Sequence, residues 1–223
     1  MSVSRRAARS ETTLRERAYG AFTEHLLKQA IRPGQFISQR ELVALTGFPL
    51  GAIRELIPRL EAEGLIVTVP QRGMQVLPVD LSLIRNAFQF RLILEREAVA
   101  AFTRSAEEDA IGRMEAAHRA VRARAERGVG PKLVEEAQQV DRQFHEAVID
   151  GLGNDIVSKA YRVNWIKVRL IRQAETSLHD ELVMPVMDEH LAVIRAMAAR
   201  DVAAAVEAAT IHIAGARNRA LRL

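Results

Sequence analysis

The sequence predicts a mainly α fold in two parts, an N-terminal winged helix-turn-helix followed by an all-α antiparallel helical bundle. Between residues 38 and 77, two short amphipathic helix patterns precede two runs that favour strands, separated by turn residues, which is the order of a helix-turn-helix with a hairpin wing. From residue 79 onward only helical periodicity remains, interrupted by Gly or Pro near residues 128–131, 151–153 and 185. This pattern predicts about six helices, and Asp80 is expected to cap the first of them. The helices are expected at residues 82–104, 106–127, 131–150, 154–177, 180–200 and 202–220. Such helices can close as a bundle around a pocket.

Local signals predict the boundaries of the two short helices. Ser38 followed three residues later by Glu41 is a capping-box pattern, and Thr46-Gly47 ends the first helix. Pro49 is expected to open the second helix, where a missing N–H does no harm, and Gly64 ends it. The two helices therefore lie within residues 38–64.

A hairpin and an earlier helix complete the front domain. Residues 65–69 and 74–77 read as strands around a turn, with Gly73 at the hairpin tip. At residues 11–29 an amphipathic helix places four apolar side chains on one face, namely Leu14, Ala18, Phe22 and Leu26. We expect this face to pack behind the helix-turn-helix.

Length and composition bound the organisation. A chain of 223 residues can hold two domains of ordinary size, and we predict a tail at residues 1–10, a winged helix-turn-helix domain at 11–78 and a helical domain at 79–223. No cysteine is present, which excludes disulfides and thiolate metal sites. No run reaches the ~20 apolar residues of a membrane span, and residues 1–13 lack the apolar centre of a signal peptide, so we expect a cytoplasmic protein.

The net positive charge of the chain comes entirely from its first third. Residues 1–78 hold 11 Lys and Arg against 7 Asp and Glu, whereas residues 79–223 hold 21 of each kind. A trihelical domain with a hairpin can also bind proteins, but this excess favours nucleic acid because phosphate contacts need positive charge. The side chains that would supply it are Arg40, Arg54, Arg59 and Arg72.

The bundle contains a group of potential metal ligands. Asp141 and His145 lie four residues apart and so share a helix face, while His190 and His212 each fall among apolar neighbours on later helices. A single His on an apolar face is more often a core residue. Three such His with one Asp are what Zn, Ni, Mn or Fe accepts, with coordination positions left for water or a ligand oxygen.

Five short segments of the front domain form a recognisable series of motifs. They are Ile31-Arg32-Pro33-Gly34, Arg40-Glu41-Leu42, Ile53-Arg54-Glu55, Arg59-Leu60-Glu61-Ala62-Glu63-Gly64-Leu65 and Pro70-Gln71-Arg72-Gly73. With these segments the front domain resembles the DNA-binding domain of GntR-family transcription regulators. The resemblance implies that Arg40 and Arg54 contact operator bases or phosphates, and that the wing, with Gln71 and Arg72 and with Gly73 at its tip, reaches the minor groove.

The rear domain resembles the FCD effector-binding domain of FadR-like GntR regulators. Its motifs match at Asp141 with His145, Gly153-Asn154, Glu189-His190, Asp201 to Ala204, His212, and Arg91 with Glu95. The resemblance implies the metal-binding type, with a divalent metal held by Asp141, His145, His190 and His212. It also implies that a small organic acid binds beside the metal and Arg91. Arg169 and Arg172 are further candidates for its carboxylate, although they also fit a solvated helix face.

One departure from the GntR pattern concerns DNA readout. Where relatives carry a polar run at the start of the recognition helix, this chain has Pro49-Leu50-Gly51-Ala52, and Pro58 is expected to kink the same helix. The readout would then depend more on Arg54, the wing and DNA shape.

The sequence therefore predicts a homodimeric repressor that binds double-stranded operator DNA and is controlled by the acid. The alternatives are a metal-dependent hydrolase or a ligand-binding protein that has lost DNA binding. No general base, H-E-x-x-H, G-x-S-x-G or phosphate-binding loop is evident, which favours a protein that is not an enzyme.

Overall fold

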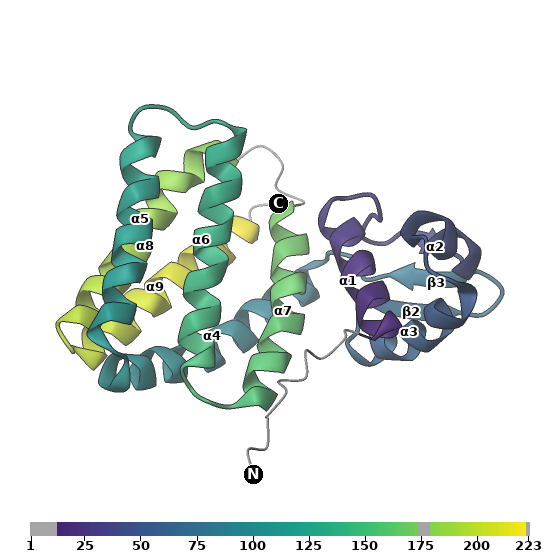
Figure 1. The fold of residues 1–223 in the computed structure, drawn as a ribbon, viewed down its shortest axis with the longest axis horizontal. Coiled ribbons are helices and arrows are strands. Elements are labelled where there is room, and N and C mark those ends of the chain that lie inside the picture. The colour runs from purple at the N-terminus through teal and green to yellow at the C-terminus, as the bar shows by residue number, and fades with distance from the viewer. Residues whose placement is uncertain (1–12, 174–178, 222–223) are drawn as a thin grey trace, which may run out of the picture. The chain divides into compact units, whose positions relative to one another are not determined.

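The structure is a computed structural model that describes residues 13–173 and 179–221, without the side chains of residues 172, 173 and 179. The chain divides into two compact units, and the boundary between them in the sequence lies between Pro78 and Val79 (Figure 1). The fold is mainly α, with a winged helix-turn-helix in the first unit and a helical bundle in the second. The predicted fold class is confirmed.

The first unit consists of three helices and a small antiparallel sheet. The helices are α1 (Leu14–Leu27), α2 (Gln39–Thr46) and α3 (Leu50–Ala62), and the strands are β1 (Phe36–Ile37), β2 (Ile66–Val69) and β3 (Gly73–Val76), in the order β1-β3-β2. Its core combines side chains from all three helices and from the sheet, including Phe22, Leu26, Leu42, Ile53, Leu56, Leu60 and Val76. The hairpin of β2 and β3 is the wing.

The predicted cap of α2 is confirmed, and one detail of α3 differs. The Glu41 N–H donates to Ser38 Oγ at 3.2 Å and the Ser38 N–H donates to Glu41 Oε2 at 2.7 Å, so the capping box is closed. Pro49 is the N-cap of α3 rather than its first residue, because its ψ of 153° is extended. The helix runs through Pro58 to Ala62; Pro58 is exposed, so water can bind the carbonyl of Arg54 that lacks its helical partner.

The start of α1 also differs from the sequence expectation. Ala18, Phe22 and Leu26 are fully buried, but the side chain of Leu14 is 47% exposed. Leu14 is the first helical residue, and Thr13 caps the helix immediately before it. The buried face therefore begins one turn later than the apolar periodicity alone indicates.

The second unit contains six helices in its described residues, and each of the six predicted helices is present. They are α4 (Leu81–Ser105), α5 (Glu108–Ala125), α6 (Pro131–Asp150), α7 (Asp155–Gln173), α8 (His179–Ala198) and α9 (Val202–Ala220). The predicted extension of the fourth of these helices to residue 177 lies partly outside the described residues. Asp80 caps α4 by accepting from the Leu83 N–H at 2.7 Å, as the sequence indicates.

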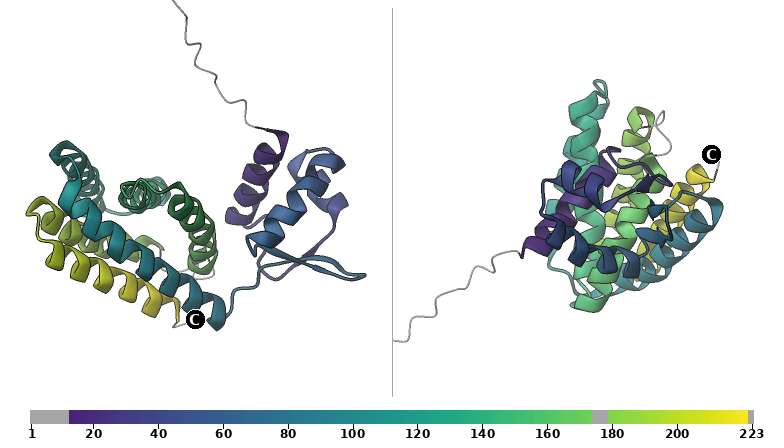
Figure 2. Two further views of the ribbon diagram at one scale, coloured as in Figure 1. Left: turned by 90° about the horizontal axis from the view of Figure 1, so that it is seen from below. Right: turned by 90° about the vertical axis from the view of Figure 1, so that its right-hand side faces the viewer.

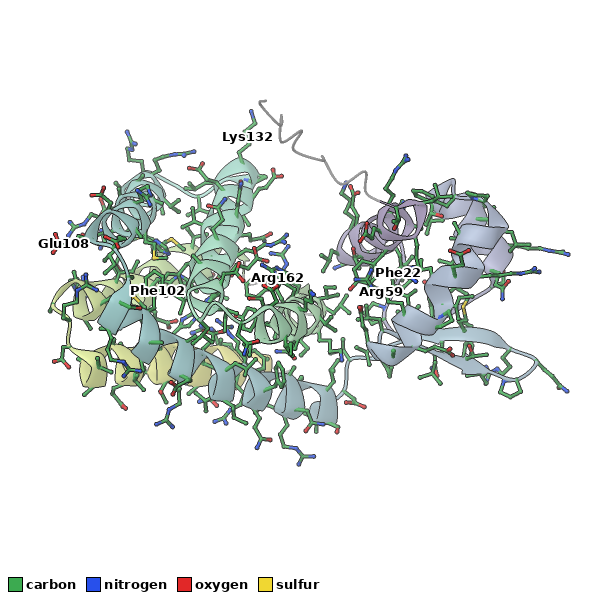
Figure 3. The ribbon with its side chains drawn as sticks, turned by 60° about the horizontal axis from the view of Figure 1, so that its bottom comes forward. Phe22, Arg59, Phe102, Glu108, Lys132 and Arg162 are labelled. Atoms are coloured by element: carbon green, nitrogen blue, oxygen red, sulfur yellow. The ribbon has the colours of Figure 1, made fainter. Side chains whose placement is uncertain are left out.

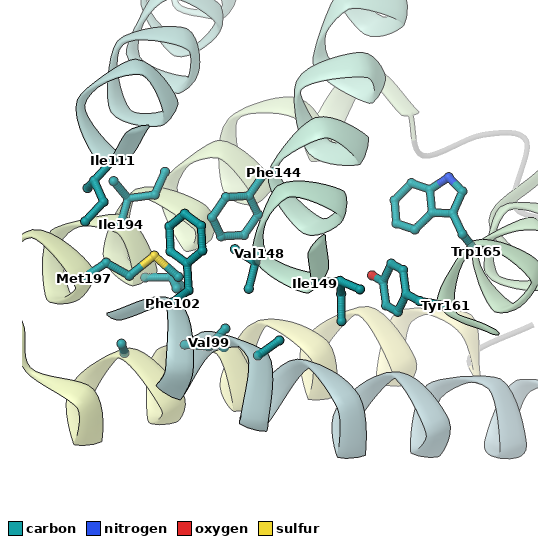
Figure 4. Close-up of a cluster of buried hydrophobic side chains, with 14 residues drawn as sticks. Val99, Phe102, Ile111, Phe144, Val148, Ile149, Tyr161, Trp165, Ile194 and Met197 are labelled. Atoms are coloured by element: carbon teal, nitrogen blue, oxygen red, sulfur yellow. The ribbon is translucent and has the colours of Figure 1, made fainter. Parts of the chain in front are cut away.

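The bundle brings helices from both ends of the second unit together. Helix α4 packs along α9 and α5 packs along α8, while α6 contacts α4, α5, α7 and α8 (Figure 2). Between them lies an apolar cluster that includes Phe102, Phe144, Val148, Tyr161, Trp165, Ile194 and Met197 (Figure 4). None of the described helices has the length and apolar character to cross a membrane.

Candidate metal centre and nucleic-acid interface

The structure brings the four predicted metal ligands together inside the bundle. Asp141 and His145 lie one turn apart on α6, His190 lies on α8 and His212 on α9, and all four are buried. The three His each offer a ring nitrogen, and these nitrogens lie within 4.8 Å of one another. Asp141 Oδ1 lies 3.9 Å from His145 Nε2 and 3.7 Å from His190 Nε2.

These distances fit a divalent metal. Two atoms that each lie ~2.1 Å from one metal are at most about 4.2 Å apart. The separation of 3.2 Å between His190 Nε2 and His212 Nε2 meets this limit, and so do both distances from Asp141 Oδ1. Imidazoles and one carboxylate are ligands that Zn, Ni, Mn and Fe all accept. The donor set is therefore compatible with a metal without specifying which one.

A fourth buried imidazole orients His190. His118 Nδ1 lies 2.6 Å from the carbonyl oxygen of Met114, which can only accept, so Nδ1 carries the proton. His118 Nε2 must then accept from His190 Nδ1, 3.1 Å away, and the lone pair of His190 Nε2 faces the other ligands. The sequence analysis did not identify His118, because no local spacing relates α5 to α8.

Carboxylates orient the other two imidazoles in the same way. His212 Nδ1 donates to Glu189 Oε2 at 2.6 Å, and Arg219 Nη1 donates to Glu189 Oε1 at 3.1 Å. His145 Nδ1 lies 2.9 Å from Glu95 Oε2. All three imidazoles thus have their Nδ1 hydrogen bonded to an outer acceptor and present Nε2 inward. Metal-binding histidines commonly have this arrangement, in which the outer hydrogen bond fixes the orientation of the ring.

Burial keeps two of the imidazoles in the form that binds metals. It lowers the pKa of His212 to about 4, although the hydrogen bond to Glu189 opposes the shift. It also lowers the pKa of His190 well below its usual value, with further lowering by the neighbouring His212 and His145. Both rings are therefore neutral near pH 7, when their lone pairs are available to a cation.

Arg91, the first candidate for the effector, lies next to these imidazoles. Its guanidinium is 1% exposed, and its Nε donates to Glu95 Oε1 at 2.5 Å. Burial would raise the pKa of Glu95, but Arg91, followed by His145, holds it well below its usual value. The buried pair is therefore charged on both sides.

Of the other two candidates for effector binding, Arg169 and Arg172, the structure describes the side chain of Arg169 only. Arg169 Nη2 donates to Gln138 Oε1 at 3.1 Å, and Gln138 and Asp141 line a cavity of about 30 Å³ between α6 and α8. The side chain of Arg172 lies outside the described residues. A cavity of this size is far smaller than the ~300 Å³ or more of typical small-molecule pockets, so an organic acid needs some side chain to move.

Replacing Glu189 by Gln is expected to weaken metal binding about tenfold. Gln can still accept from His212 Nδ1, but it removes the negative charge that makes this imidazole a stronger ligand. The dissociation constant for Zn²⁺, measured by competition with a chromophoric chelator, checks the result. Glu136→Gln, which alters an exposed carboxylate paired with Arg124, should leave the constant unchanged; an unchanged constant in Glu189→Gln would contradict the orienting role.

Four of the predicted DNA-contacting side chains are exposed on the first unit. Arg40 lies in the first turn of α2, Arg54 lies on α3, and Gln71 and Arg72 lie in the turn of the wing. Arg54 Nε is 3.4 Å from Gln39 Oε1, which links α3 to the start of α2. The guanidinium of Arg72 lies 4.0 Å from the centre of the Phe36 ring. These positions are available to a nucleic acid.

The fifth predicted side chain, Arg59, is held in contacts with other side chains of the first unit. Its guanidinium lies 3.7 Å from the centre of the Tyr19 ring, and its Nε donates to Glu63 Oε1 at 2.9 Å. Tyr19 also donates from its hydroxyl to Glu63 at 2.6 Å. Arg59 therefore faces α1 (Figure 3) and joins α1 to the end of α3. These contacts favour a structural role for Arg59 over contact with DNA.

Gly73 lies beside the wing tip rather than at it. It is the first residue of β3 and pairs with Val69, so the turn consists of residues 70–72. Its φ is +87°, and a Cβ built there would lie 3.1 Å from the carbonyl oxygen of Ile37 on the neighbouring strand. The structure therefore requires glycine for the backbone of the wing, which corrects the predicted place of Gly73 at the tip.

Gly73→Ala is expected to destabilise the first unit by about 1–2 kcal/mol, because an L side chain is strained at this φ and crowds Ile37. For a domain of this size that corresponds to a fall of about 5–10 °C in the melting temperature. Scanning calorimetry of the full chain measures it as a shift of the first-unit transition. Gly51→Ala has open space at its Cβ and should leave the transition unchanged or raise it, whereas no fall in Gly73→Ala would contradict the strain argument.

Comparisons with known proteins agree for both units. Residues 14–76 match the family described as bacterial regulatory proteins, gntR family, and residues 86–215 match the FCD domain. A protein of Paraburkholderia xenovorans (strain LB400), described as the HTH-type transcriptional regulator BphR, is 27% identical over 165 residues, which cover 73% of this chain and 67% of that protein.

Solved structures share the fold. McbR/YncC of E. coli has a TM-score of 0.78 at 15% identity and covers 94% of this chain and 98% of its own. A GntR regulator from Rhodococcus sp. RHA1 has a TM-score of 0.74 at 18% identity, covering 93% and 97%. An FCD domain described as metal-free, from TM0439, has a TM-score of 0.54 at 19% identity, covering 65% and 95%. This chain therefore belongs to the GntR family of bacterial transcriptional regulators and carries an FCD domain.

Proposed function

We propose that the protein is a cytoplasmic repressor whose affinity for operator DNA is controlled by a small organic acid bound beside a divalent metal. The metal ligands in this proposal are Asp141, His145, His190 and His212. The observation that carries it is the orientation of the three imidazoles, each hydrogen bonded through Nδ1 to an outer acceptor and presenting Nε2 to a common centre. GntR regulators bind operators, and their FCD domains bind effectors.

The DNA contacts in this proposal come from the recognition helix and the wing. Helix α3 would lie in the major groove, where Arg54 reaches base edges or phosphates, and Arg40 would contact the backbone. The first turn of α3 offers no polar side chain, but Leu50 is 39% exposed there and can contact a thymine methyl group. Since one winged helix reads few base pairs, a homodimer that binds two half-sites is expected.

The acid would bind where the metal keeps open coordination positions. A metal with four protein ligands can still accept a carboxylate oxygen if it is five- or six-coordinate. Arg91 is the cationic side chain that contacts the ligand imidazoles in the described residues. A guanidinium can bind a carboxylate through two parallel hydrogen bonds. Arg169, beside the cavity near Asp141, is a second candidate for the other end of the acid.

The route from the acid to DNA would begin at α4. This helix starts at Leu81, directly after the boundary between the units, and it carries Arg91 near its middle. A displacement of Arg91 would therefore act on the helix that leads into the DNA-binding unit. Control of this kind requires that the acid bind one arrangement of the dimer better than another.

Operator binding of the full chain tests the proposal. Duplexes selected from genomic fragments by the protein are titrated by fluorescence anisotropy, first with Zn²⁺ present and then after chelation, each with a panel of organic acids. We expect at least one acid to weaken DNA binding several-fold only when metal is present. A DNA affinity that responds to no acid known from calorimetry to bind the protein would reject the regulatory model.

A further inference from the structure

The guanidinium of Arg91 lies among the imidazoles where the proposed metal would be held. Its Nη2 atom is 2.7 Å from His145 Nε2 and 3.2 Å from His212 Nε2. It is also 3.3 Å from His145 Nδ1, so it lies over the face of that ring rather than in line with the lone pair of Nε2. Arg91 is thus a cation placed inside a cluster of cation-binding nitrogens.

A metal at this cluster cannot avoid the guanidinium in its present position. A metal ~2.1 Å from His145 Nε2 would lie at most about 4.8 Å from Arg91 Nη2, and nearer for most directions of approach. Burial strengthens the repulsion between the two cations, because the surroundings screen charges poorly. Glu95 balances the charge of Arg91 by accepting from Nε, while Nη2 is the atom nearest the imidazoles.

The inward lone pairs explain why the cluster can accept either the Arg91 guanidinium or a divalent metal ion. His190 Nε2 and His212 Nε2 are 3.2 Å apart, and neither carries a proton if both Nδ1 atoms donate outward. Two facing lone pairs repel each other unless a positive charge lies nearby. We infer that Arg91 and the divalent metal compete for the same imidazoles, so that metal loading displaces the guanidinium; this inference rests on the metal site of the proposed function.

Displacement would also prepare the binding site for the acid. Glu95 Oε1, which accepts from Arg91 Nε and from the Tyr161 hydroxyl at 2.6 Å, gives the guanidinium a pivot. Once the imidazoles coordinate the metal, Arg91 Nη2 would no longer contact His145 and His212. Its N–H groups would then be available to donate to a carboxylate at the metal. The sequence of events is therefore metal first and acid second.

The competition is tested by the affinity of the chelator-treated full chain for Zn²⁺. Removing Arg91 alone would leave Glu95 as an unpaired buried carboxylate, so the double variant Arg91→Met/Glu95→Gln is used. It keeps the net charge of the site, and the amide that replaces the Glu95 carboxylate retains an oxygen that can accept from His145 Nδ1. The reference is Glu95→Gln, which loses the same carboxylate beside His145 Nδ1 but keeps Arg91. We expect the double variant to bind Zn²⁺ at least tenfold more tightly than Glu95→Gln.

A matched control is the exposed pair of Arg162 and Asp150, joined at 2.7 Å. The variant Arg162→Met/Asp150→Asn should bind Zn²⁺ as the wild-type protein does. An affinity of Arg91→Met/Glu95→Gln equal to or weaker than that of Glu95→Gln, with circular dichroism showing that both proteins are folded, would overturn the competition and leave the proposed metal site intact. Absence of Zn²⁺ binding in every protein would overturn the metal site as well.

Discussion

Replacing His190 by Ala is expected to abolish the thermal stabilisation that a divalent metal gives to the second unit. A metal held in the folded protein at about 100 times its dissociation constant stabilises it by ~2.7 kcal/mol, which for a unit of this size raises the melting temperature by about 5–10 °C. His190 is completely buried, and its Nε2 lies within 4 Å of both Asp141 Oδ1 and His212 Nε2. Without it the remaining ligands cannot enclose the ion.

Trp165 gives a direct readout of this effect. It is the only tryptophan of the chain, lies in the core of the second unit, and its ring centre is 5.9 Å from that of His145. Its fluorescence therefore follows unfolding of the unit that holds the metal. The comparison is the rise in melting temperature on adding Zn²⁺ to chelator-treated protein, which separates metal binding from any loss of packing in the variant.

A histidine outside the cluster supplies the control. His25→Ala changes a side chain on α1 in the first unit, and the metal-induced rise should remain. A rise of the same size in His190→Ala would show that the metal binds elsewhere. Asp141→Asn, which preserves the shape of the side chain, should retain part of the rise because three imidazoles remain.

The helices were predictable because their causes are local. The capping boxes and the Gly and Pro interruptions lie within a few residues of the boundaries that they determine, as Ser38 with Glu41 and Asp80 before α4 illustrate. The exceptions depend on context. Pro49 takes the N-cap position instead of the first turn, and Leu14 stays exposed, since neither outcome follows from apolar spacing alone.

The sequence could predict the ligands of the candidate metal site but not the groups that orient them. Asp141 with His145, and His190 and His212 on apolar faces, could be grouped because a bundle has one interior. The outer acceptors could not be assigned, because the contacts of His118 with His190 and of Glu189 with His212 join different helices. By contrast, the spacing of Arg59 and Glu63 already indicated an ion pair within α3, and this signal could have removed Arg59 from the DNA-binding candidates.

Arg54→Ala is expected to weaken operator binding by roughly tenfold or more, corresponding to ~1–3 kcal/mol for a base contact. Arg54 is exposed on α3, and the first turn of this helix has no polar side chain to replace it. Fluorescence anisotropy with the selected operator measures the loss, and titration at several salt concentrations identifies its kind. Loss of a phosphate contact lowers the salt dependence by about one ion per site, whereas loss of a base contact relaxes the sequence preference.

Arg59→Ala is the matched control, since it removes the same side chain from the same helix. Five helical residues place the two arginines about 140° apart around α3, and Arg59 is held against Tyr19 by Glu63. Its loss should lower the stability of the first unit while leaving operator affinity per folded molecule nearly unchanged. Equal losses of affinity in Arg54→Ala and Arg59→Ala would mean that DNA lies across both faces of α3, which a helix inserted in a single groove does not allow.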